Sequence, residues 1–196
     1  MDQVRRRKSG ADRKAEIVDT VIQLSATMGP DRVTTQHLAD AVGVTQPAIF
    51  RHFGTKAEIW DAVSERIVTD IEGITRTAGD ALDGLRDYVK NFVDLVKWRP
   101  ALPSILHSLE LQADNAALRD RFHAMHSERT SMIAGLVEQG QGARIIRHDL
   151  KPSEVAGVVL SSLHGLTLDW TLKGQTFDLE EEGARLADNL IAMIRT

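Results

Sequence analysis

Apolar residues recur at helical spacing along almost the whole chain. From Ala11 to Met28 they fall close to every 3.6 residues, which predicts an amphipathic helix that Gly29-Pro30 ends. The same periodicity predicts longer helices over about 56–77, 81–98, 116–139, 154–173 and 179–195, and a short one over 104–112. No strand-like alternation and no internal repeat interrupts it. With two short helices near residues 34–54, the pattern predicts an all-α protein of about nine helices.

The two short helices are predicted from their end signals. Thr34 or Thr35 can cap the first, over Gln36–Val42, because a hydroxyl accepts a free backbone N–H there. Gly43 ends it, since glycine readily adopts a positive φ. Thr45 can cap the second helix. Two short helices joined by a glycine-containing turn predict a helix-turn-helix unit.

The second helix of such a unit enters the DNA major groove with its first residues at the base edges. Gln46 can hydrogen-bond adenine, while the methyl groups of Thr45 and Ala48 can meet thymine methyls. Polar and basic residues around the unit can contact phosphates. We predict that DNA is contacted by Thr34, Thr35, Gln36, Thr45, Gln46, Pro47, Ala48, Phe50, Arg51, His52 and Lys56.

A family resemblance follows from these residues. The segment contains Leu38-Ala39, Ala41-Val42-Gly43-Val44, Ile49-Phe50-Arg51-His52-Phe53, and Lys56 followed by Glu58. With this combination, Thr35–Val63 resembles the N-terminal domain of the TetR/AcrR family of bacterial transcriptional regulators. That family usually has tyrosine where this chain has Phe50. Phenylalanine lacks the hydroxyl, so it cannot donate that tyrosine's bond to phosphate.

The resemblance implies a division into three parts: a basic flexible arm over 1–10, a DNA-binding domain over 11–56, and a helical ligand-binding and dimerisation domain over 57–196. It also implies a ligand-responsive, sequence-specific regulator, most simply a repressor that a small molecule releases from its operator. The expected partners are a palindromic double-stranded operator, a second copy of the chain and an effector of unknown identity, with no cofactor. The expected location is the bacterial cytoplasm, with the protein on the nucleoid when DNA is bound.

Dimerisation through the last two helices is a further implication of the resemblance. Residues at helical spacing there are candidates for the contact: Val155, Val159, Ser162, Leu163, Gly165, Leu166, Leu186, Leu190 and Ile194. The same stripes also fit an intramolecular core.

A ligand pocket is expected among the middle helices. Large apolar and aromatic side chains suit such a pocket. The candidates are Trp60, Phe92, Val96, Trp98, Leu102, Ile105, Leu106, Leu109, Phe122, Met125 and Trp170. Any helical core would contain similar residues.

Composition and charge narrow the kinds of site and the classes of protein that this sequence can represent. The absence of cysteine excludes disulfides, thiolate catalysis and cysteine-based zinc sites. The net charge of −4 is unevenly divided, because residues 1–56 carry +3 and the remainder −7. A basic N-terminal segment on an acidic body fits a polyanion-binding head, although a solvated basic tail gives the same count. No apolar run approaches the ~20 residues of a membrane span, and no signal peptide is evident.

Three other hypotheses remain at this point. His107, Glu110, His123 and His126 are spaced so that each pair lies on one helix face, which suits zinc or iron, but His123 shares its face with solvated residues. An enzyme using these four residues would need bound metal, and no catalytic-triad order or nucleotide loop supports one. An architectural DNA-binding protein without an effector would use the same head and a tightly filled body.

Overall fold

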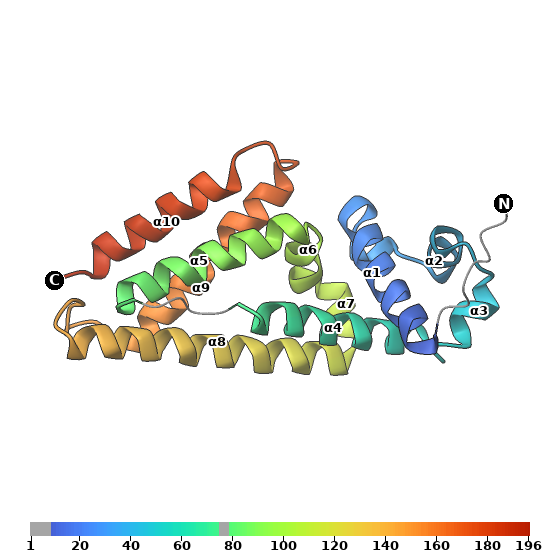
Figure 1. The fold of residues 1–196 in the computed structure, drawn as a ribbon, viewed down its shortest axis with the longest axis horizontal. Coiled ribbons are helices and arrows are strands. Elements are labelled where there is room, and N and C mark those ends of the chain that lie inside the picture. The colour runs from blue at the N-terminus through green and yellow to red at the C-terminus, as the bar shows by residue number, and fades with distance from the viewer. Residues whose placement is uncertain (1–8, 75–78) are drawn as a thin grey trace.

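The computed structural model describes residues 9–74 and 79–196. Over these ranges it consists of ten α-helices, one 3-10 helix and no strand, so the all-α prediction is confirmed. The helices form an elongated molecule with α1 to α3 gathered at one end and the C-terminus at the other (Figure 1).

The small group at one end, here called the head, is formed by short elements. It comprises α1 (Gly10–Met28), η1 (Pro30–Arg32), α2 (Thr35–Val42) and α3 (Gln46–Phe50). Ser9 caps α1, since its hydroxyl accepts from the N–H of Asp12 at 3.1 Å. Of the basic arm predicted for residues 1–10, positions 1–8 lie outside the described residues, and Gly10 is already helical.

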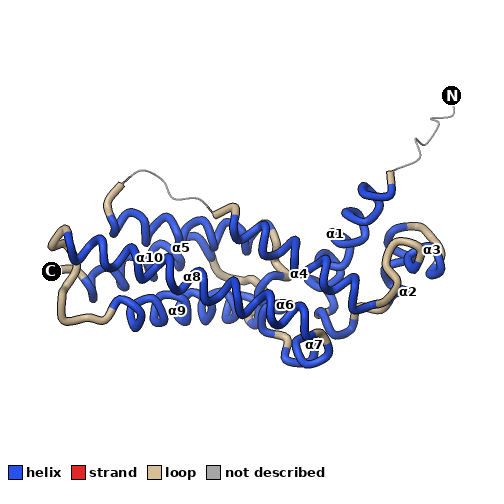
Figure 2. Tube along the Cα trace, turned by 90° about the horizontal axis from the view of Figure 1, so that it is seen from below, coloured by secondary structure: helices blue, strands red, loops and turns tan. Residues whose placement is uncertain are grey.

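The remaining helices form the body. They are α4 (Lys56–Glu72), α5 (Ala81–Trp98), α6 (Leu102–His107), α7 (Leu109–Asp114), α8 (Ala116–Gly142), α9 (Pro152–Leu172) and α10 (Leu179–Ile194). The long α8 packs against α9, α4 and α5, and α10 packs against α5, which leaves one broad face of α9 outside the bundle (Figure 2). Residues 75–77 of the predicted fourth helix lie outside the described residues, and α4 ends at Glu72.

One continuous core joins the head to the body. The buried stripe of α1 meets α2 and α4, and α4 in turn packs against α8. Trp60, Val63 and Ile67 of α4 are each at most 2% exposed. Burial of such large apolar side chains is the main source of stability in a helical protein.

The segment predicted as one helix over 104–112 forms two. Ser108 breaks it, because its backbone is extended and its hydroxyl caps α7 by accepting from the N–H of Leu111 at 3.0 Å. The same hydroxyl donates to Asp31 in the head at 2.5 Å. This break accounts for a tenth helix where about nine were predicted. The helix predicted over 116–139 also continues further, since α8 ends at Gly142.

Two glycines of α8 allow a matched test of the packing. A Cβ at Gly140 would lie 2.4 Å from Cδ1 of the fully buried Ile146 and 3.2 Å from Cβ of Ala81, whereas a Cβ at Gly135 would meet nothing within 4 Å. Gly140→Ala should therefore lower the free energy of unfolding by ~1–2 kcal/mol through overpacking. Gly135→Ala should raise it by ~0.5–1 kcal/mol through helix propensity. Urea denaturation of both variants checks this, and equal effects would contradict the close approach at Gly140.

Candidate nucleic-acid interface

The helix-turn-helix is built by local capping. The Thr34 hydroxyl accepts from the N–H of His37 at 3.1 Å, which fixes the start of α2. Gly43 has φ 73°, in the left-handed region that favours glycine, and ends α2. Pro47 lies in the first turn of α3, where its missing N–H costs no hydrogen bond. The turn between α2 and α3 is thus determined by residues within it.

Apolar side chains hold the two helices against α1. Leu38 and Ala39 of α2, Ile49 of α3 and Phe53 after it are at most 5% exposed and join the buried stripe of α1. Ala39 is fully buried, so its small side chain lets the helices approach closely. The opposite face of α3 is consequently turned outward.

None of the eleven predicted DNA-contacting residues is buried. Seven are exposed: Thr34, Gln36, Thr45, Pro47, Phe50, Arg51 and Lys56; four are partly covered: Thr35, Gln46, Ala48 and His52. Within the described residues neither Arg51 nor Lys56 has an ion pair, so both cations are available to an anion. Phe50 is 41% exposed and therefore stands on the surface and not in the core.

Besides Thr34, three of these polar side chains have hydrogen-bond partners within the described part of the head: Thr35, Gln36 and Gln46. The Gln46 side-chain amide donates from Nε2 to the hydroxyl of Thr35 at 2.5 Å, which joins the first turns of α2 and α3. Gln36 donates to Asp40 at 2.7 Å, one turn later on α2. Sequence spacing did not predict the bond between Thr35 and Gln46.

A set of ion pairs joins the head to the body. Asp19 of α1 pairs with Arg66 of α4 at 2.9 Å and with Arg99 at 3.1 Å. Arg99 also pairs with Asp70 of α4 at 3.2 Å, and its guanidinium lies 4.0 Å from the centre of the Trp98 ring. The Arg99 side chain is 13% exposed, so water screens these pairs less than it screens surface pairs.

The predicted pocket residues divide into two groups. Most are buried in the body: Trp60, Phe92, Val96, Leu102, Ile105, Phe122, Met125 and Trp170, with Leu106 partly buried. Trp98 and Leu109 instead lie at the surface of this chain, at 63% and 83% exposure. Trp98 ends α5 on the side away from its buried stripe, and Leu109 opens the short α7. Trp170 donates its indole N–H to the carbonyl of Phe177 at 3.1 Å, which ties the turn between α9 and α10.

The residues predicted for dimerisation mostly face inward. Val155, Val159, Leu163, Leu190 and Ile194 are buried within this chain at 8% exposure or less. Ser162, Leu166 and Leu186 are partly covered, and Gly165 is exposed. Helical spacing alone identifies a stripe but does not show which of two apolar stripes on one helix faces the core.

The outward stripe of α9 is a different set. It consists of Val158, Ser161, Gly165, Leu168 and Leu172, spaced by three or four residues. Val158 is 55% and Leu172 76% exposed, and Met193 of α10 is 59% exposed. Among the described helices α9 alone is long and apolar enough to cross a membrane by length and composition, and 39% of its most apolar window is buried. This helix therefore carries apolar side chains on an uncovered face.

Three histidines gather where α6, α8 and α9 meet. The ring of His164 lies 5.5 Å from that of His107 and 5.9 Å from that of His126, between ring centres. The pKa of His164 is lowered to about 4, first by burial and then by the charges of the other two imidazoles. Sequence spacing had grouped His107 and His126 with Glu110 and His123. Within the described ranges no three histidine or acidic side chains lie in position to share a metal ion.

Two family profiles match the chain. The profile described as bacterial regulatory proteins, tetR family, matches residues 17–63, which contain the helix-turn-helix. The profile described as MAATS-type transcriptional repressor, C-terminal region, matches residues 85–196, more than half of the chain.

Two curated relatives are similar to this chain, one over part of its length and the other over most of it. The nucleoid occlusion factor SlmA of Vibrio campbellii is 32% identical over 119 residues, which are 58% of this chain and 61% of that protein. The match thus spans about three fifths of the relative. The transcriptional regulator AcrR of Shigella flexneri is 23% identical over 196 residues, 95% of this chain and 91% of that protein.

Solved structures share the fold over nearly the whole chain. The ketosteroid transcriptional regulator KstR2 of Mycobacterium tuberculosis has a TM-score of 0.78 at 16% identity, covering 94% of this chain and 95% of that one. FadR from Bacillus subtilis in complex with stearoyl-CoA scores 0.71 at 19%, covering 92% and 98%. A regulator from Saccharomonospora viridis in complex with choline scores 0.77 at 19%, covering 95% and 99%.

The His164 imidazole predicts a pH-dependent stability. An unfolded chain binds its proton near pH 6.5, whereas the folded chain resists protonation until about pH 4. The unfolded state therefore gains protons first, and stability should fall by roughly 2 kcal/mol as the pH drops through this window. His164→Phe should remove most of that loss, while His148→Phe, at an exposed imidazole, should keep it. Urea denaturation at neutral and acidic pH checks this, and an unchanged loss in His164→Phe would contradict it.

Proposed function

Because the chain belongs to the TetR family of bacterial transcriptional regulators, we propose that it is a repressor that a small-molecule effector releases from a palindromic operator. The observation that supports this most directly is the outward face of α3. The residues of its first turn are exposed or only partly covered, and the cations Arg51 and Lys56, unpaired within the described residues, lie near it in the chain. We propose residues 11–56 as the DNA-binding domain and 57–196 as the ligand-binding and dimerisation domain. The protein would act in the cytoplasm, on the nucleoid.

The DNA contacts divide by type. Thr45, Gln46, Pro47 and Ala48 open α3 and would meet base edges in the major groove. Thr34, Thr35, Gln36, Arg51, His52 and Lys56 would meet phosphates around them, which sets register without reading sequence. Phe50 would contact the DNA backbone through its ring, because it has no hydroxyl to donate to a phosphate. Most of the affinity would come from the phosphate contacts and would fall with salt.

Dimerisation would use the outward stripe of α9. Ser161 and Gly165 are small and lie at its centre, and a Cβ at Gly165 would meet nothing in its own chain within 4 Å. Nothing within this chain therefore needs a glycine there, whereas a close partner helix would. Two copies paired by a two-fold axis would present two heads ~34 Å apart, one helical turn of DNA. A second copy would also cover Val158, Leu172 and Met193.

The effector would act through α4. A ligand among the buried residues of the body would bias the position of α4, which the pairs of Asp19, Arg66 and Arg99 tie to α1. Such a ligand shifts the spacing of the two heads only if it binds the DNA-free arrangement more tightly. The structural neighbours solved with stearoyl-CoA and with choline show that this fold can hold small molecules in those proteins.

The likeness to SlmA supports a second candidate. That relative is named a nucleoid occlusion factor, and this chain could likewise be a nucleoid-binding protein that uses its head without an effector. This second candidate function predicts that no small molecule changes the affinity of the protein for DNA. The repressor is favoured because the second profile, which covers the body, describes transcriptional repressors.

Two substitutions in the head should separate phosphate contact from base reading. Selection of random duplexes by the purified protein should yield a palindromic consensus. On that duplex Lys56→Ala removes one phosphate contact in each half-site, so it should lower the slope of log K against log salt by about two per dimer and weaken the binding of all sequences alike. Gln46→Ala should instead lose ~1–3 kcal/mol of discrimination at one base pair in each half-site. Lys151→Ala, at an exposed lysine next to α9, is the control. Wild-type behaviour in both head variants would show that the groove assignment is wrong.

A charge on the outward stripe of α9 should split the dimer. Val158→Asp puts a carboxylate where two copies would bury apolar surface, so the variant should sediment as a monomer at concentrations where the wild type is a dimer. Leu109→Asp is the control, since Leu109 is also an exposed apolar residue but lies on α7, outside the proposed interface. Both variants should keep their helical circular dichroism. A Val158→Asp dimer would contradict the proposed interface.

A further inference from the structure

An arginine occupies a core position of α8. The buried stripe of this helix runs through Phe122, Met125, Arg129, Ile133 and Leu136, at helical spacing. Every other member of the stripe is apolar or glycine, whereas Arg129 brings a permanent charge. Its side chain is only 10% exposed. The position is one where the helix pattern alone would require an apolar residue.

The partners of Arg129 are weak. Its Nη2 lies 3.8 Å from the carboxylate of Glu128, which is itself 64% exposed, and its Nη1 lies 4.0 Å from the sulfur of Met132. Its Nε is buried and has no hydrogen-bond partner among the residues that the structure describes. Arg99, by contrast, pairs with two aspartates at 3.1 and 3.2 Å. The Nε of Arg121 is likewise buried without a partner, but the guanidinium of Arg121 has a close counter-ion, Asp61 at 2.6 Å, which Arg129 lacks among the described residues.

A buried charge without a close counter-ion destabilises the folded state. Removing a guanidinium from water is costly, and only a well-placed anion with good hydrogen bonds offsets that cost. An apolar side chain of similar length would serve the core better. A purely structural role therefore does not account for Arg129, whereas a bound anion beside Nε would.

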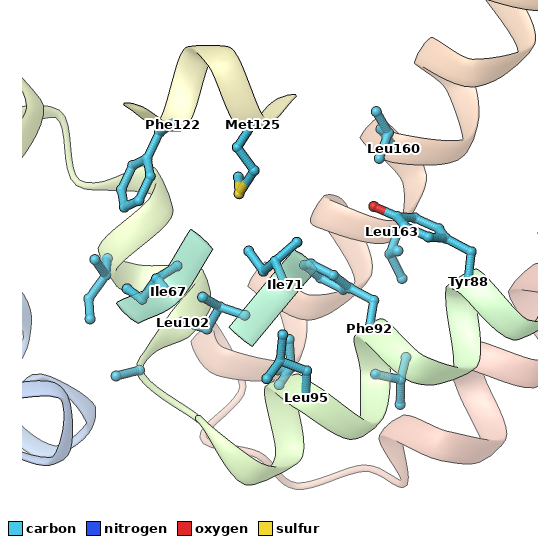
Figure 3. Packing of buried hydrophobic residues seen from close by; sticks show 14 of the residues in the cluster. Ile67, Ile71, Tyr88, Phe92, Leu95, Leu102, Phe122, Met125, Leu160 and Leu163 are labelled. Atoms are coloured by element: carbon cyan, nitrogen blue, oxygen red, sulfur yellow. The ribbon is translucent and has the colours of Figure 1, made fainter. Parts of the chain in front are cut away.

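Aromatic side chains continue from this charge into the body. Burial raises the pKa of Tyr88 to about 12, and the charge of Arg129 acts against that rise. Tyr88 stacks with Phe92 at 6.5 Å between ring centres, and Phe92 lies 5.9 Å from His164. Figure 3 shows Tyr88 and Phe92 reaching from α5 toward α9, with Phe122 and Met125 of α8 turned toward Ile67 and Ile71 of α4. One end of this region is thus cationic, and apart from His164 the side chains beyond it are aromatic or aliphatic.

We propose that the effector is an apolar molecule with a single carboxylate, and that Arg129 binds this carboxylate. A guanidinium presents Nε–H and one Nη–H side by side, which matches the two oxygens of a carboxylate. The aromatic and aliphatic side chains around Tyr88 and Phe92 would contact the apolar part. A cation such as choline would be repelled by the same group. The inference deepens the proposed function, because it assumes that the body binds an effector.

The test uses the full-length protein and a series of straight-chain carboxylates, from butanoate to hexadecanoate, each beside the alcohol of the same length. The midpoint of thermal unfolding and the heat of binding are measured below the critical micelle concentration. At least one carboxylate should bind about tenfold or more tightly than its alcohol, and choline should not bind. If no carboxylate binds more tightly than its alcohol, the proposal is wrong.

Substitutions of Arg129 test whether this residue binds the carboxylate. Arg129→Met should keep or raise the melting temperature of the ligand-free protein and abolish the preference for carboxylate over alcohol. Arg129→Lys keeps the positive charge but cannot donate two parallel hydrogen bonds to one carboxylate. This variant should therefore bind the carboxylate with intermediate affinity. Arg121→Met is the control on the same helix. It loses the pair with Asp61 and should lower the melting temperature while keeping the carboxylate preference.

The outcomes separate this inference from the repressor itself. A palindromic duplex consensus without any carboxylate preference would overturn the anion site and leave DNA binding in place. Carboxylate binding that Arg129→Met and Arg129→Lys both retain would also overturn it. Carboxylate binding lost in Arg129→Met, with no duplex selected, would instead support the anion site and reject the repressor.

Discussion

The burial of α4 between the head and the body is the constraint on which the rest of the structure depends. It packs against both α1 of the head and α8 of the body, so neither part has a complete core without it. Arg66 and Asp70 of the same helix join the ion pairs of Asp19 and Arg99. Packed interfaces of this kind have discrete arrangements and do not deform continuously, so a small change in the body can reposition the head.

Features of the structure that depend only on residues close by in the sequence were predictable. Thr34 and Gly43 mark the ends of α2 where they were expected, and Pro47 lies in the first turn of α3. These signals act within a few residues, because a cap or a positive φ needs no distant partner. The head could therefore be located, and its outward residues named, before any tertiary contact was known.

Features that depend on distant partners were not predictable. The break at Ser108 depends on Asp31 in the head, and the histidine group needed His164 from a third helix. On α9 both stripes are apolar, so periodicity favoured the one around Leu163, although the stripe around Val158 is the uncovered one. Only the packing of α8 and α10 distinguishes them. Burial of Arg129 is likewise visible only once its neighbours are in place.

The bond between Thr35 and Gln46 bears on how the head would find its operator. A side-chain amide that faced the groove without an internal partner would lose a hydrogen bond at every wrong base. Here one N–H of Nε2 keeps its bond to the hydroxyl of Thr35 when no matching base is present, so a mismatched site leaves one donor fewer unsatisfied. Contact with unrelated DNA then rests on phosphates alone and stays mobile along the duplex. The first turn of α3 would thus favour rapid sliding before it favours recognition.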